Sequence, residues 1–270
     1  EISPVEGILY KLRQTIGAIP SIPFITAGDP SPDDTVALMN TLVENGADMI
    51  ELGIPFSDPM ADGPVIQRAS ERALKNKVGI KDTIKLAKSF RETNKKTPLI
   101  LMGYANPIEA IGVDNFISLI KEAQIDGVIT VDYPPEESGE FVKRLNEEEI
   151  DSIFLLSPTT EDERIKLIAK QASGFLYYVS LKGVTGAANI DIEQVSENVK
   201  NIQKYSDLPV AVGFGVRDPK TAKAVSRISD GVVIGSRIVR EIEESDKVEI
   251  IPNVKKLMHS MKAAIDSSSA

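Results

Sequence analysis

The chain has 270 residues, of which 42% are hydrophobic and 26% charged, and its formal net charge is −9. This acidic balance, without a cluster of Lys and Arg, argues against nucleic-acid binding, and zero cysteines exclude disulfides and thiolate chemistry. No apolar run approaches the roughly 20 residues that span a bilayer, and residues 1–20 lack a signal-peptide pattern. We therefore expect a cytoplasmic protein, or a plastid protein if the source is photosynthetic.

Eight short apolar segments alternate with helical patterns along the chain. These segments are rich in Ile, Val, Leu and Phe and cover residues 21–28, 47–55, 98–106, 126–134, 152–158, 175–183, 208–216 and 230–236. Near-continuous apolar strands of this kind are typical of parallel sheets, which are buried on both faces. The amphipathic segments predicted as helices include residues 32–46, 113–124, 162–173 and 253–265.

Eight strands alternating with helices predict an α/β fold, a (β/α)8 TIM barrel, with an extra N-terminal helix around residues 4–16 that covers the barrel floor. A doubly wound open sheet is the rival fold, but no GxGxxG motif follows the first strand. Because no linker or shift in composition divides the chain, we expect residues 1–270 to form a single domain, with residues 266–270 as a disordered tail.

The stretch ELGIPFSDPMADGP, residues 51–64, places Glu51 in a strand whose neighbours are apolar. Since the strand cores lack Lys and Arg, a salt-bridged structural role for Glu51 has no obvious cation. Desolvation is then expected to raise the pKa of Glu51 and to ease proton exchange near neutral pH. A carboxylate held by backbone groups or by a Tyr hydroxyl is the alternative that stays open.

Asp62 follows in the loop after this strand, at the end of which catalytic groups lie in such barrels. Asp-Gly-Pro is also common turn chemistry, with Pro64 at the first helical position. Gly63 would then be the N-cap, which leaves Asp62 one residue too early to cap the helix. Both a functional and a turn-forming Asp62 stay open.

Glycine-rich segments follow the last three predicted strands: GVTGA at 183–187, GFGV at 213–216 and GSR at 235–237. Glycines let backbone N–H groups approach an anion closely, and the loops after strands 7 and 8, with a short helix N-terminus, form the usual phosphate site of this barrel. The sequence therefore predicts a phosphate site at these ends.

Other candidates are weaker. Lys182 borders a glycine-rich loop, which argues against a Schiff-base lysine. His259 lies beside the apolar stripe of the last helix and is expected to be structural. A Mg²⁺ site from Glu51, Asp62 and Asp132 lacks a ligand spacing pattern, so we expect no metal.

PFITAGDP (23–30), ELGIPFSDPMADGP (51–64), GVTGA (183–187), GFG (213–215) and GSRIV (235–239) resemble the tryptophan synthase alpha subunit family, and the similarity runs from about residue 8 to 265. The resemblance implies a carbon-carbon lyase of tryptophan biosynthesis. Such a lyase cleaves indole-3-glycerol phosphate to indole and glyceraldehyde 3-phosphate by a retro-aldol reaction, without a cofactor in this chain.

The resemblance also implies site residues. Glu51 would be the general acid-base and Asp62 would bind the indole N–H. The expected substrate contacts are Phe24, Tyr104, Tyr177, Thr185 and Phe214, and the expected phosphate contacts are Gly186, Gly215, Gly235 and Ser236.

The resemblance further implies a beta subunit that contains pyridoxal phosphate, an alpha2beta2 heterotetramer, and direct transfer of indole to the partner. The expected interface residues are Pro55, Asp58, Asn106, Asp132 and Pro134, and Phe56 and Met60 are expected to be exposed nearby. A free-standing lyase that releases indole is the alternative. A catalytically silent subunit is disfavoured by the presence of both acids, and a related phosphate-binding isomerase is a third possibility.

Overall fold

The structure is a computed structural model, and it describes residues 3–7, 9, 18–180, 191–213 and 215–268. Eight parallel strands close into a barrel in chain order, with β8 paired to β1. The strands are Ser21–Thr26 (β1), Ile50–Gly53 (β2), Leu99–Gly103 (β3), Gly127–Thr130 (β4), Asp151–Leu156 (β5), Leu176–Val179 (β6), Val210–Gly213 (β7) and Gly231–Ile234 (β8). The predicted (β/α)8 barrel is therefore confirmed, and the open sheet is wrong.

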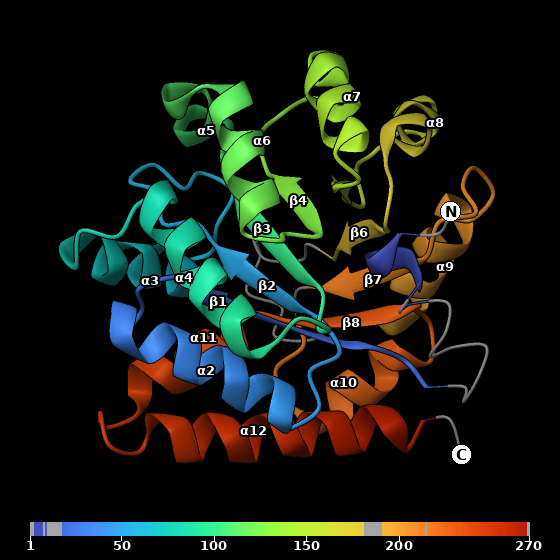
Figure 1. The fold of residues 1–270 in the computed structure, drawn as a ribbon. Coiled ribbons are helices and arrows are strands. Elements are labelled where there is room, and N and C mark those ends of the chain that lie inside the picture. The colour runs from blue at the N-terminus through green and yellow to red at the C-terminus, as the bar shows by residue number, and fades with distance from the viewer. Residues whose placement is uncertain (1–2, 8, 10–17, 181–190, 214, 269–270) are drawn as a thin grey trace.

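Helices surround the strands (Figure 1). They are Pro32–Glu44 (α2), Pro64–Lys75 (α3), Ile80–Thr93 (α4), Ala105–Ile111 (α5), Val113–Glu122 (α6), Gly139–Glu147 (α7), Asp162–Gln171 (α8), Ile192–Ile202 (α9), Pro219–Ser226 (α10), Ser236–Glu244 (α11) and Ile250–Asp266 (α12). Three of them are capped by a side chain at the N-terminus, from Ser31, Asp191 and Asp218.

Side chains alternate between the barrel interior and the helix layer, as strand pleating requires. The interior cluster includes Ile22, Met49, Ile100, Ile129, Ile153, Phe175, Tyr177, Ala211 and Val233. The outward cluster beneath the helices includes Ile25, Ile50, Leu52, Leu99, Leu101, Val210, Val212, Val232 and Ile234. Met49 lies directly before β2, and Glu51 lies two residues after Met49, so the Glu51 side chain belongs to the interior face.

The floor of the barrel is covered from the N-terminal side. Residues 4–7 and 9 are helical, and Val5 and Leu9 are buried in the interior cluster. This confirms the predicted cap for the part of it that is described; residues 10–16 of that helix lie outside the described residues.

Helix α12 packs along α2, α10 and α11. Val254, Met258, Met261 and Ile265 are fully buried, whereas His259 is exposed on the same helix. The helix continues to Asp266, and the Ser268 hydroxyl lies 2.8 Å from that of Ser226. Of the tail that we expected to be disordered, Asp266 therefore belongs to the helix and Ser268 contacts α10, while Asp266 and Ser267 are exposed. Residues 269–270 lie outside the described residues.

A chain of ion pairs joins the loop after β1 to helices α3 and α11. Arg72 on α3 binds the fully buried Asp29 through two hydrogen bonds of 2.7 and 2.9 Å. Its third contact, of 2.6 Å, is to Glu243 on α11. Glu243 also accepts two hydrogen bonds, of 2.7 and 2.6 Å, from Arg68. These charge-assisted bonds fix α3 against α11, and the N-termini of both helices line the cavity described next.

Candidate active site

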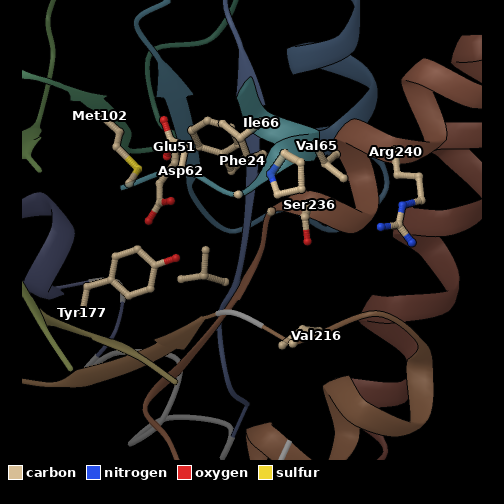
Figure 2. A pocket seen from close by; sticks show the side chains of 15 residues that line it. Phe24, Glu51, Asp62, Val65, Ile66, Met102, Tyr177, Val216, Ser236 and Arg240 are labelled. Atoms are coloured by element: carbon tan, nitrogen blue, oxygen red, sulfur yellow. The ribbon is translucent and has the colours of Figure 1, made fainter. Parts of the chain in front are cut away.

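The carboxyl ends of the strands open into a cavity of about 260 Å³ (Figure 2). It contains two carboxyl groups at one end and a helix N-terminus at the other. Its lining residues are Phe24, Glu51, Asp62, Gly63, Pro64, Val65, Ile66, Met102, Tyr177, Gly215, Val216, Val233, Gly235, Ser236 and Arg240. Because the first and last of these come from β1 and α11, only the closed barrel brings them together.

Glu51 is fully buried on β2, directly beside Phe24 of β1 and Ile100 of β3 in the strand register. Neither of its carboxylate oxygens has a hydrogen-bond partner among the described residues. Burial therefore raises the pKa of Glu51 to about 8, because desolvation penalises the charged form. Within that part of the chain, the alternative of a carboxylate held by backbone or Tyr groups is wrong.

Tyr177 of β6 directs its hydroxyl into the space beside these acids (Figure 2). Burial raises the pKa of this phenol well above its ordinary value, and the charge of Glu51 adds to the effect. Tyr177 therefore stays protonated and can act only as a neutral group near the substrate.

Asp62 lies in the loop between β2 and α3. Gly63 is the N-cap of α3 and Pro64 is its first residue, as predicted, and no side chain caps this helix. The Asp62 carboxylate instead accepts a hydrogen bond from the hydroxyl of Tyr104, which itself accepts from the N–H of Ala61 at 3.1 Å. Burial raises the pKa of Asp62 to about 6, although Tyr104 opposes the shift. The side chain is directed into the site rather than used in the turn.

The opposite end of the cavity is formed by the loop after β7 and the start of α11. Gly215 has a φ of +81°, which favours glycine, and Gly235 is the N-cap of α11 with Ser236 as its first residue. The N-terminus of a helix attracts anions through its free N–H groups and its dipole.

Arg240 also lines this end, and sequence reasoning missed it. It is exposed and has no ion pair or hydrogen bond with the described residues. Its position four residues after Ser236, one helical turn away, is the signal that could have found it.

Apolar groups connect the two ends, namely Phe24, Val65, Ile66, Met102, Val216 and Val233. Only Phe24 among these was predicted. Val65 and Ile66 sit in the first turn of α3, where the sequence offered only the signal of an apolar helix face. Phe214, Thr185, Gly186 and Lys182 lie outside the described residues.

The expected interface residues lie around the mouth of the barrel, in different environments. Asp58 and Asn106 are exposed, Pro134 is half-buried, and Pro55 is buried. Asp132 accepts a hydrogen bond of 2.7 Å from the N–H of Ala105 at the start of α5. Contact of these residues with a partner stays a prediction.

The two apolar side chains that we expected to be exposed in the loop after β2 differ in their exposure to solvent. Met60 is 80% exposed, as predicted. Phe56 is half-buried, because its ring packs on Tyr104 with 5.2 Å between the centroids, so its predicted exposure is wrong.

Within the described ranges, no group of three His, Cys, Asp or Glu side chains is placed to hold a metal ion. Over the same residues, no helix is both long and apolar enough to cross a membrane.

The described residues form a parallel barrel with a buried carboxyl on β2 that has no partner among them, and a helix N-terminus suited to an anion lies across the same cavity. This combination defines an acid-base enzyme of the TIM-barrel class. Residues 14–266 match the family model described as tryptophan synthase alpha chain. The chain belongs to the tryptophan synthase alpha chain family.

Individual relatives agree with this assignment. The tryptophan synthase alpha chain of Janthinobacterium sp. (strain Marseille) is 54% identical over 264 residues, which cover 96% of this chain and all of the relative. That of Thiobacillus denitrificans is 56% identical over 92% of this chain and 91% of its own. The crystal structure of tryptophan synthase subunit alpha from Legionella pneumophila superposes with a TM-score of 0.92 at 42% identity, covering 99% of this chain and 100% of that one. The protein is thus a carbon-carbon lyase of tryptophan biosynthesis that cleaves indole-3-glycerol phosphate.

The buried Glu51 predicts a pH dependence of stability that does not involve substrate. Its pKa is about 8 in the folded chain, against 4.5 for an unperturbed glutamate side chain. Between these values the folded state holds a proton that the unfolded state has lost, so stability falls as the pH rises, by about 1.4 kcal/mol per pH unit. E51Q removes this loss. In thermal unfolding experiments from pH 5 to 9, we expect the stability of E51Q relative to the wild type to increase as the pH rises.

The control is E44Q, because Glu44 is an exposed carboxylate. The difference between E44Q and the wild type should not vary with pH in this range. If E51Q and E44Q behaved alike from pH 5 to 9, Glu51 would not be a buried proton-holding group.

Proposed function

We propose that Glu51 and Asp62 are the catalytic pair of the cleavage reaction, with Glu51 as general acid and base and Asp62 as the group that binds the indole N–H. The observation that carries this proposal is that two carboxyl groups share one cavity and titrate on opposite sides of neutral pH, about 8 for the pKa of Glu51 and about 6 for that of Asp62. Two such acids with separated pKa values can hold different roles in one reaction.

Glu51 is mostly protonated at neutral pH, so it can donate its proton to C3 of the indole ring. It then becomes the carboxylate that takes the proton from the glycerol hydroxyl. The bond between C3 and the adjacent glycerol carbon breaks, and its electron pair returns to the indole ring as the hydroxyl oxygen becomes an aldehyde. Glu51 gives one proton and recovers one, so it ends the cycle as it began.

Asp62 is mostly ionised at neutral pH and suits the other role. Protonation at C3 makes the indole nitrogen cationic, and a carboxylate that accepts the N–H stabilises that charge where it develops. The hydrogen bond from Tyr104 orients the Asp62 side chain for this contact.

The rest of the cavity fits the two halves of the substrate. Phe24, Met102 and Tyr177 present apolar surface for the flat indole ring. Gly215, Gly235 and Ser236 offer backbone and hydroxyl donors for the phosphate, and Arg240 adds a positive charge. Contacts from Phe214, Thr185 and Gly186 stay predictions.

We also propose that the chain works with a tryptophan synthase beta subunit in an alpha2beta2 heterotetramer and passes indole to it. One related structure is described as tryptophan synthase from M. tuberculosis in an aminoacrylate-bound form, and its matching chain has a TM-score of 0.87 at 31% identity. The exposure of the apolar Met60, in the loop after β2, supports the proposal that a partner binds at the barrel mouth. Pyridoxal phosphate is expected in the beta subunit, and the cytoplasmic location stays a prediction.

The roles of the two acids predict that both substitutions slow indole release, each for a different reason. E51Q should lower kcat at least 100-fold, because the variant cannot exchange the proton. D62N should lower kcat by roughly 100-fold, through lost stabilisation of the developing charge. Steady-state indole release measures both, and binding of glycerol phosphate should persist in each variant. Near-normal turnover by E51Q would remove Glu51 from the mechanism, and an unchanged kcat in D62N would return Asp62 to a turn-forming role.

The position of Arg240 predicts an effect on substrate binding. R240A should raise KM for indole-3-glycerol phosphate about tenfold, equivalent to about 1.4 kcal/mol, with kcat little changed. The effect should shrink as salt is added, because the contact is exposed. R227A is the control, since Arg227 is exposed at the C-cap of α10 and does not line the cavity. Equal KM values for both variants would place the phosphate elsewhere.

The proposed partner predicts activation. The isolated chain should cleave its substrate slowly, and a beta subunit from the same source should raise the rate by roughly 100-fold by aligning the groups in the loop after β2. Asp58 is exposed in that loop, so D58A should weaken activation more than the basal rate. Steady-state indole release with and without the beta subunit tests this. Full activity of the isolated chain would favour the free-standing lyase.

A further inference from the structure

A second cavity lies behind Asp62, at the carboxyl ends of β1 to β4. Its space for the centre of a water molecule amounts to about 20 Å³. Its walls are Phe24, Thr26, Gly53, Ile54, Asp62, Ile66, Ser70, Met102, Gly103, Tyr104 and Val131. A cavity needs about 10–15 Å³ on this measure, and two to four polar partners, to hold one water molecule. This one has room for a single water and four polar side chains around it.

Thr26 is the polar group with the clearest need of a partner. It is the last residue of β1, it is only 2% exposed, and its hydroxyl oxygen has no hydrogen-bond partner among the described residues. A buried hydroxyl without a partner is uncommon, because its hydration is lost on folding and nothing replaces it. The unpartnered hydroxyl of Thr26 is independent of the cavity volume, and both observations indicate a water molecule in this cavity.

Asp62 supplies the complementary group. Its carboxylate has about four acceptor sites, and Tyr104 supplies one donor. The Tyr104 oxygen is already shared, since it also accepts from the N–H of Ala61. A water molecule held by the hydroxyls of Thr26 and Ser70 can supply a further donor to Asp62 from within this cavity.

We propose that the cavity holds one ordered water molecule that donates a hydrogen bond to Asp62 and is held by the hydroxyl of Thr26, which makes Thr26 a positioning residue for Asp62. The water completes the hydrogen bonding of Thr26 and gives the carboxylate a second donor beside Tyr104. Two donors on different elements, β1 through the water and α5 through its N-cap residue Tyr104, fix the plane of the Asp62 carboxyl group.

The proposal has an electrostatic consequence. Hydrogen bonds to a carboxylate stabilise its charged form and so oppose the effect of burial. Without the water, Asp62 would titrate at higher pH, and less of it would be ionised when it meets the indole N–H. This part rests on the role proposed for Asp62 above, whereas the water site itself does not.

The variants T26V and T26S separate the hydroxyl from the shape of the side chain. T26V keeps the branched shape and removes the hydroxyl, and T26S does the reverse. In T26V we expect the pH at which the Asp62 carboxyl carbon titrates in ¹³C NMR to rise by about one pH unit. We expect kcat at pH 7 to fall about tenfold with little change in KM. T26S should recover most of both losses.

A high-resolution crystal structure of the wild type should show the water between Thr26 and Asp62, and one of T26V should lack it. Thr26 with a packing role alone would give the opposite order, with T26S impaired and T26V close to the wild type. An unchanged titration of Asp62 in T26V, or no water at this position in the wild type, would overturn the proposal. If D62N keeps normal turnover while the titration in T26V still shifts, the proposed role of Asp62 fails and the water site stands.

Discussion

The desolvation of Glu51 is the constraint on which the site depends. A carboxyl group in an apolar barrel interior, without a cation or donor among the described residues, takes up a proton rather than remaining charged. The barrel supplies this environment because Glu51, on β2 between β1 and β3, faces the barrel interior, as does Met49 just before the strand. In the mechanism proposed above, the proton on this group lies next to the substrate, and the same proton makes the fold less stable at high pH.

The same barrel gives Asp62 a different environment. It sits in a loop at the mouth, and Tyr104 donates to it, so its pKa rises only to about 6 while that of Glu51 reaches about 8. One of two chemically similar groups is therefore an acid and the other a base at neutral pH. The difference arises from position in the fold, because burial and available donors decide the charge state.

The two ends of the cavity are connected by structure as well as by space. Helix α3 starts two residues after Asp62, and helix α11 starts at the end of the cavity that we propose binds the phosphate. Arg72 and Arg68 on α3 both bind Glu243 on α11, and Arg72 also anchors Asp29 in the loop after β1. Hydrogen-bonded ion pairs of this kind hold α3 and α11 together. Side chains outside the cavity therefore help to set the distance between the two acids and the start of α11.

The sequence by itself determined the barrel, because eight buried parallel strands are visible in it as short apolar segments that alternate with amphipathic helical segments. It also determined that Asp62 lies one residue too early to cap α3, since this follows from local spacing. Only the tertiary structure decided the partners. Residues from different elements meet in the hydrogen bond of Asp62 with Tyr104, in the packing of Phe56 on Tyr104, and where Arg240 reaches the cavity. The structure also leaves the buried hydroxyl of Thr26 without a partner among the described residues. Such contacts between elements depend on which strands lie side by side in the folded chain, which no local pattern encodes.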